Sequence, residues 1–272
     1  MLAEGRCSLD ASFAAYKFLI MYGQLLSLSG ILQYYFGVNM SQAFWIITDG
    51  TTAPLSWALT KALPAKRLAK TRPTARLIGP ETVWSIVGQI IIHVVFLCIL
   101  VVLLFQQDWF RCNEYDASKA DLRRWWELGD NYESSITSLL VTFQILMTSA
   151  VYNLGSTYRR GFLKNWILIL FVSVLMAMIL FITLADPNMV GCWFRVNCGT
   201  ESALVAQGYE YASTIWMLPQ QYYIPQGHNV IEKSFRWVIV GIMFANVAVA
   251  MLFHEIVILG PVRKWARSLK RD

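Results

Sequence analysis

The sequence predicts an all-α protein, a polytopic transmembrane helical bundle of six spans. Hydrophobic residues make up 56% of the 272 residues, and charged residues only 15%. A soluble domain carries about a quarter charged residues, so the apolar excess requires lipid rather than a larger core. The mean hydropathy of +0.46 agrees with this. The apolar residues also form long runs, and the basic residues fall in the shorter segments between those runs.

Six apolar stretches approach or reach the length of a membrane span. A helix needs about 20 apolar residues to cross the hydrocarbon core of a bilayer. The third and fifth stretches are the most apolar, and the second is the weakest. The predicted spans cover residues 14–36, 43–60, 83–106, 135–154, 166–185 and 236–259.

The charged residues predict the orientation of these spans. Sixteen of the 23 Lys and Arg residues fall on one side of the six-span arrangement, which the positive-inside rule assigns to the cytosol. Both termini are then cytosolic, as an even number of spans requires. The predicted organisation is a cytosolic lead-in at 1–13, a first helix pair at 14–60, a basic cytosolic loop at 61–82, a four-helix support region at 83–259 with acid-rich lumenal loops at 107–133 and 186–235, and a basic cytosolic tail at 260–272.

The net charge of +6 is explained by this topology and does not indicate nucleic-acid binding. Of the five cysteines, Cys192 and Cys198 lie in a predicted lumenal loop, where an oxidising environment allows a disulfide between them. The alternative is that these thiols are free or paired otherwise, with Cys112 in the other lumenal loop. The cysteines and the three histidines do not have the spacing of a zinc site.

Asp49 is the clearest functional candidate, because it is a carboxylate inside the second span. A charged side chain in a span costs about 2.5–3.5 kcal/mol on insertion scales, so we expect it to be buried in protein and functional. Gly50, Thr51, Thr52 and Pro54 follow it, and this run predicts an unwound backbone. A carboxylate beside freed carbonyls forms a cation site in transporters. The alternative is a carboxylate near the lumenal interface that caps the helix or pairs with a neighbour.

Tyr22 and Gln24 lie in the middle of the first span and complete the predicted substrate site. The linker at 37–42 is so short that the first two spans form a hairpin, which brings both side chains within reach of Asp49. The ring of Tyr22 also suits an alkylammonium group. Ordinary hydrogen bonding between helices is the alternative, and for Gln24 it is the better explanation.

The sequence lacks every common motif for nucleotide or metal chemistry. It has no G-x-x-x-x-G-K-[ST] loop, no G-x-G-x-x-G after a strand and no H-E-x-x-H. The predicted loops are also too short to hold a nucleotide-binding domain. We therefore expect this chain to bind no cofactor, to contain no catalytic residues and not to hydrolyse ATP on its own.

Four motifs, at 4–22, 46–50, 72–73 and 131–133, together resemble the fifth class of P-type ATPases, and in detail its subgroup B, the polyamine-transporter-like pumps. The run EGRCSLDASFAAYKFLIMY at 4–22 is similar to the entrance of the fifth membrane helix in that family. An acidic residue in the next helix follows, here in IITDG at 46–50. Arg72-Pro73 then leads into a helix with a central Gln, and Asn-Tyr-Glu at 131–133 precedes a Ser-rich helix with Phe-Gln. The resemblance covers about residues 4 to 165, and residues 166–272 match only in hydropathy.

The resemblance implies that the chain forms the last six helices of a ten-helix transport core. The family pumps polyamines from an endolysosomal or vacuolar lumen into the cytosol with ATP and Mg²⁺ as cofactors. Tyr22 and Asp49 match its substrate-contacting positions. The partners implied are membrane lipid, a small cationic substrate and the remaining N-terminal part of the pump.

Four departures from the family pattern leave other functions open. The Asp-Lys-Thr-Gly-Thr phosphorylation motif, the Thr-Gly-Glu motif and the Pro-Pro-rich fourth helix are missing from the chain. The sequence around Asp49 also differs from the more apolar sequence that is usual in the family. The alternatives are a non-enzymatic membrane scaffold or regulatory fragment, and an autonomous carrier or channel.

Overall fold

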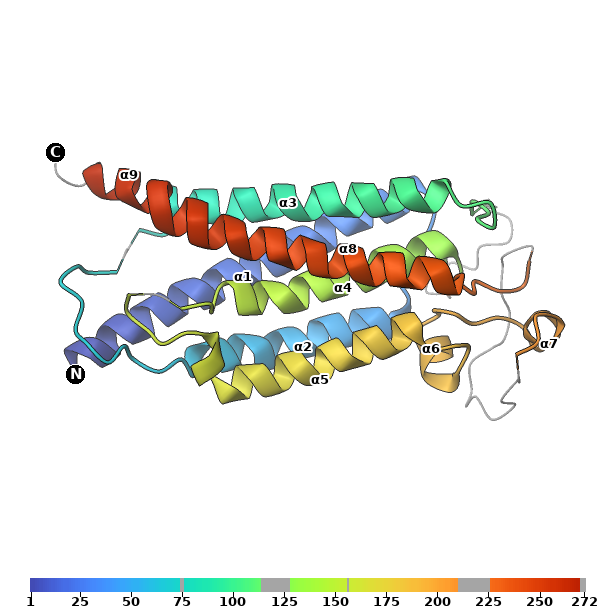
Figure 1. The fold of residues 1–272 in the computed structure, drawn as a ribbon, viewed down its shortest axis with the longest axis horizontal. Helices are drawn as coiled ribbons and strands as arrows, with labels where there is room; N and C mark the ends of the chain where they lie inside the picture. The colour runs from blue at the N-terminus through green and yellow to red at the C-terminus, as the bar shows by residue number, and fades with distance from the viewer. Residues whose placement is uncertain (74–75, 114–127, 156, 210–225, 270–272) are drawn as a thin grey trace.

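The computed structural model is a bundle of long helices, and it describes residues 1–73, 76–113, 128–155, 157–209 and 226–269 (Figure 1). Within these ranges there is no β-strand, only two isolated β-bridges. The long helices are α1 (Leu2–Tyr35), α2 (Gln42–Thr60), α3 (Pro80–Phe105), α4 (Tyr132–Val151), α5 (Trp166–Leu184) and α8 (Lys233–Leu252). The short elements are η2 (Phe162–Lys164), α6 (Met189–Trp193), α7 (Glu201–Ala206), η3 (Phe253–Val262) and α9 (Arg263–Ser268).

The long helices run side by side along the long axis of the molecule (Figure 1). The N-terminus and α9 lie at one end, and α6 and α7 lie at the other. Five segments have the length and apolarity of a membrane span: α1, α3, α4, α5 and the continuous α8–η3–α9 segment. These findings confirm the all-α membrane bundle. The sixth predicted span is α2, which lies within the bundle but falls short of that apolarity, so the count of six stays a prediction.

The structure bears on two of the predicted segment boundaries. The predicted lead-in at 1–13 and the first predicted span form one continuous helix, because α1 begins at Leu2 and is 34 residues long. Much of the two predicted lumenal loops, residues 114–127 and 210–225, lies outside the described residues.

The bundle is organised around α4. All 20 residues of α4 are buried, and α4 packs against α1, α2, α3, α5 and α8. Many of its residues are Ser or Thr, whose small side chains allow helices in a membrane to approach closely. Their hydroxyl groups bond to the helix's own carbonyls, as Thr137 does to Glu133 and Thr148 to Gln144. The central helix is therefore polar in composition without leaving these hydroxyls unpaired.

Buried polar side chains tie α3, α4 and α8 together. His93 Nδ1 lies 2.9 Å from Asn246 Oδ1, and the Gln144 side-chain amide donates to the His93 carbonyl at 3.0 Å. Gln89 donates to the Ala250 carbonyl at 2.9 Å. Hydrogen bonds between membrane helices contribute about 0.6 kcal/mol each on average. These contacts give His93 a structural role.

Ion pairs fix the end of the bundle that carries the N-terminus. Arg159, which follows α4, pairs with Asp10 of α1 at 2.7 Å. Arg263 of α9 pairs with Glu81 of α3, with its Nε 3.0 Å and its Nη2 2.8 Å from one carboxylate oxygen. Burial lowers the pKa of Arg159, and the Asp10 carboxylate opposes that shift.

Candidate cation-binding site

Asp49 and Tyr22 meet on neighbouring helices. The Tyr22 hydroxyl of α1 donates a hydrogen bond to Oδ1 of Asp49 in α2. The tight 37–42 turn, with Gly37 at φ +66°, reverses the chain between the two helices. The proximity that the short linker predicts is therefore present in the structure.

Asp49 is exposed on the flank of α2, contrary to the prediction of a buried carboxylate. The inner face of α2 is formed instead by Thr48, Thr52 and Leu55, which are buried against the bundle. Because successive residues of a helix are rotated by about 100°, the residue after Thr48 points away from α4 and α5. The rotation of α2 about its axis therefore turns Asp49 outward, away from the interior of this bundle.

The predicted unwound backbone is wrong, because α2 is helical from Gln42 to Thr60 with Pro54 inside it. A backbone group without a partner costs several kcal/mol in hydrocarbon, which favours a continuous helix. Pro54 has no N–H, so only the Gly50 carbonyl loses its helical donor. Thr52 donates to the Thr48 carbonyl at 2.8 Å, and Ser56 donates to the Thr52 carbonyl at 2.8 Å. The site therefore consists of side chains and one free carbonyl, with no unwound segment.

Gln24 does not join this pair. It is exposed on α1, and in the described part of the chain it makes no hydrogen bond to Asp49. It lies two residues from Tyr22, which rotates it by about 200° around the helix. The predicted trio is thus reduced to Tyr22 and Asp49 in direct contact.

The surface around the pair is open. A Cβ atom added to Gly23 or to Gly50 would have no heavy atom within 4 Å beyond its own helix neighbourhood. These glycines adjoin Tyr22 and Asp49 in sequence, so the backbone beside the pair is open. A carboxylate accepts hydrogen bonds from an ammonium group, and a phenol ring attracts a cation to its face. The pair is chemically suited to hold an organic cation.

The start of α2 is held by a segment that sequence analysis did not connect to the site. Ser41 Oγ, at the N-cap of α2, donates to the Phe194 carbonyl at 2.9 Å. The rings of Phe44 and Phe194 pack edge to face with centroids 5.0 Å apart. Phe194 lies 150 residues beyond Phe44 in the chain, so no local pattern in the sequence could have indicated this contact.

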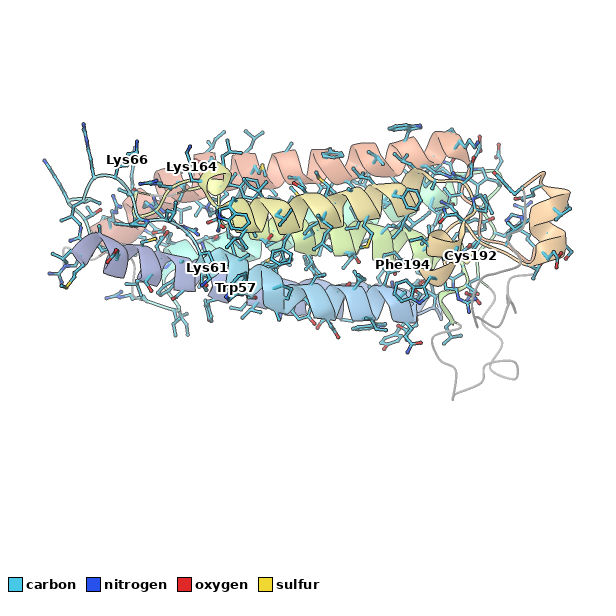
Figure 2. The ribbon with its side chains drawn as sticks, turned by 90° about the horizontal axis from the view of Figure 1, so that it is seen from below. Trp57, Lys61, Lys66, Lys164, Cys192 and Phe194 are labelled. Carbon is cyan, nitrogen blue, oxygen red and sulfur yellow. A yellow bond between two sulfur atoms is a disulfide. The ribbon has the colours of Figure 1, made fainter. Side chains whose placement is uncertain are left out.

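A disulfide closes this segment. Cys192 and Cys198 are bonded, and both are buried. We call residues 192–198 the knuckle. Within it, Arg195 pairs with Asp130 at 3.0 Å, and its carbonyl accepts a hydrogen bond from Ser135 Oγ of α4 at 2.8 Å. The knuckle thereby joins the start of α2 to the start of α4 (Figure 2).

A second contact at this end joins α5 to α8. Arg236 of α8 is buried and donates to the Leu184 and Ala185 carbonyls and to Asp186 Oδ1, at 3.0–3.1 Å. Lys233 donates to Asp186 Oδ2 at 2.9 Å. The hydrogen bond from Lys233, supported by Arg236, holds the pKa of the Asp186 carboxyl below its ordinary value.

The fold and site define a class of protein: a helical membrane bundle with a carboxylate–phenol pair on one flank. No family model matches the chain. Three human proteins are similar to it. Polyamine-transporting ATPase 13A2 is 26% identical over 61% of this chain, polyamine-transporting ATPase 13A3 is 28% identical over 73%, and probable cation-transporting ATPase 13A4 is 22% identical over 68%.

The chain is therefore homologous to the fifth-class P-type ATPases of subgroup B, as its motifs predict. It covers 14%, 18% and 17% of the length of these three relatives. The homology accordingly concerns a part of the membrane region of such a transporter.

Proposed function

We propose that this chain is the part of an ATP-driven transporter that contacts a small organic cation, most simply a polyamine. The observation that carries the proposal is the Tyr22–Asp49 hydrogen bond on an open flank of α1 and α2. The names of the human relatives, two polyamine-transporting and one cation-transporting, support the class of cargo.

The exposure of Asp49 supports a partner for this flank. A carboxylate that faces lipid at mid-span costs about 2.5–3.5 kcal/mol on insertion scales. We propose that the remaining part of the transporter covers the flank and leaves a polar path between itself and Asp49. ATP and Mg²⁺ would bind in that other part, since this chain carries none of the motifs for them.

Two observations support an orientation with the termini in the cytosol. Lys61, Lys66 and Lys164 lie at one end of the bundle, and Cys192 lies at the other (Figure 2). Basic loops favour the cytosolic side, and disulfides form in oxidising compartments. We propose that the knuckle faces an organelle lumen of the endolysosomal or vacuolar type, from which the cation is taken up.

The test is Asp49→Asn in the complete transporter that contains this chain, with spermine-stimulated ATP hydrolysis as the measurement. A hydrogen bond to a charged group contributes about 1.5–3 kcal/mol, so we expect spermine to be required at about 10- to 150-fold higher concentration, or to lose its effect. Expression and membrane insertion should not change.

Asp108→Asn is the matched control, because Asp108 is an exposed carboxylate that lies just after α3 and outside the site. The control should respond to spermine as the wild type does. An unchanged response in Asp49→Asn would contradict the proposed role. No response to spermine in any variant would favour the scaffold, and ATP-independent spermine uptake by vesicles that contain this chain alone would favour the carrier.

A further inference from the structure

A small charged cavity lies between α1, α3 and η3, at the end of the bundle that carries the N-terminus. It has a volume of about 30 Å³. A cavity needs about 10–15 Å³ to hold one water molecule, so there is room for one or two particles of that size. Five of the ten residues that line it are charged: Asp10, Lys17, Glu81, Arg159 and Arg263.

The two carboxylates of the cavity are already paired with two of its cations. Asp10 pairs with Arg159 at 2.7 Å, and Glu81 pairs with Arg263 at 2.8 Å. The third cation, Lys17, makes no hydrogen bond or ion pair with the residues that the structure describes. Three cations against two carboxylates, with the imidazole of the lining neutral, give the lining a net charge of +1.

Lys17 and His254 both contact the ring of Tyr152. The Lys17 Nζ atom lies 4.6 Å from the centroid of that ring, and the His254 ring packs edge to face on it with centroids 5.8 Å apart. His254 is only 6% exposed, yet its Nδ1 has no hydrogen-bond partner in the described part of the chain.

Both side chains therefore need a further partner. The face of a phenol ring attracts an ammonium group, but it does not accept the three hydrogen bonds that an ammonium can donate. An imidazole nitrogen buried without a partner is also costly. Because Lys17 and His254 line the same cavity, one negatively charged acceptor inside it could serve both.

We propose that the cavity binds a single chloride ion. The Lys17 ammonium supplies the counter-charge, and the Nδ1–H group of His254 donates a hydrogen bond to the ion. The volume excludes phosphate and carboxylate ligands, which have several heavy atoms. Water would fill the same space but would leave the net charge of the lining without compensation. The ion would connect α1, which carries Lys17, to η3, which carries His254.

The test measures thermal unfolding of this chain in a nonionic detergent while sodium chloride replaces sodium gluconate at constant ionic strength. A ligand that binds only the folded state raises the unfolding midpoint once its concentration exceeds its Kd. Gluconate is too large for the cavity, and both salts screen exposed charges equally. We therefore expect the midpoint of the wild type to rise with the chloride concentration. The ³⁵Cl NMR line of the same samples should broaden through exchange with the bound ion.

Lys17→Met should remove both effects, because it deletes the charge and keeps a long side chain. Lys61→Met is the matched control: Lys61 lies at the same end of the bundle, with its Nζ atom 4.9 Å from the centroid of the Trp57 ring, but does not line the cavity (Figure 2). The control should respond to chloride as the wild type does.

His254→Phe keeps a ring against Tyr152 and removes the N–H donor. A hydrogen bond to a charged group accounts for about a 10- to 150-fold change in affinity, so the variant should need that much more chloride for the same shift in midpoint. An equal midpoint in chloride and gluconate for the wild type would overturn the proposal and leave water as the occupant. A chloride response that persists in Lys17→Met, or that is lost in Lys61→Met, would also overturn it. The assay contains no polyamine, so its result is independent of the proposed transport function.

Discussion

At the scale of single residues, Asp49 is an ionisable group with one protein donor, the Tyr22 hydroxyl, in the described part of the chain. Facing hydrocarbon costs the carboxylate about 2.5–3.5 kcal/mol, and a hydrogen bond to a charged group returns about 1.5–3 kcal/mol. The phenol therefore offsets much of the cost without neutralising the charge. The Asp49 carboxylate is therefore still able to bind a cation.

Tyr22→Phe should weaken spermine binding by about 10- to 150-fold, because it removes the hydrogen bond to the charged Asp49 carboxylate, worth about 1.5–3 kcal/mol, and keeps the aromatic ring. Isothermal titration of the chain in nanodiscs measures this effect. Tyr16→Phe is the control, since Tyr16 lies on the same helix and contacts Phe13 instead of Asp49. An effect no larger than that of the control would remove Tyr22 from the site.

The sequence predicts the contact between these residues but not its surroundings. The brevity of the 37–42 linker and the mid-span positions of Tyr22 and Asp49 are enough to bring the two together. Exposure of Asp49 is a matter of rotation about the axis of α2. That rotation is set by Thr48, Thr52 and Leu55, which all pack inward, and hydropathy distinguishes the inner face from the outer face poorly in a weakly apolar helix.

At the scale of elements, α2 is anchored at its start by the knuckle and is regular along its length. The Phe194 carbonyl accepts a hydrogen bond from Ser41, and the Phe194 ring packs on Phe44, the third residue of the helix. Gly50 and Pro54 predict an unwound helix, but α2 is continuous. Because a bilayer core offers no water to backbone groups, a helix that keeps all its hydrogen bonds except the one that Pro54 removes is favoured. The low helix propensity of Gly50 and Pro54 is therefore outweighed by the cost of unpaired backbone groups in a bilayer.

The variant Cys192→Ser/Cys198→Ser should lower the stability of the bundle and loosen the start of α2. Removal of a disulfide that closes a loop of this length lowers the free energy of unfolding by roughly 2 kcal/mol, because the unfolded chain gains conformational entropy. Thermal unfolding in detergent should show a lower midpoint, and a reductant should lower the midpoint of the wild type but not that of the double variant. Cys98→Ser, a change at an exposed cysteine of α3, should leave the midpoint almost unaltered.

A wild-type midpoint that does not respond to a reductant would mean that the disulfide does not stabilise this region. A lower midpoint with unchanged spermine binding would mean that the knuckle stabilises the bundle without positioning Asp49.

At the scale of the whole molecule, the apolar runs and the charges between them were sufficient to predict a helical membrane bundle. Hydropathy is a sum over about 20 residues, so it survives local irregularities such as the π-helical segment of η3. It does not reveal which helix is central. The full burial of α4 follows from small hydroxyl side chains that fit between five neighbours, and these residues lower its apparent apolarity.

The central claim is that an organic cation binds this chain at Asp49. Magic-angle-spinning NMR of the chain in lipid bilayers, with ¹³C-labelled aspartate and ¹⁵N-labelled spermine, measures the distance between the two directly. We expect an ion-pair separation of about 4 Å between a spermine nitrogen and the Asp49 carboxylate, with the signal lost in Asp49→Asn. Bound spermine that shows contacts to other carboxylates and none to Asp49 would contradict it.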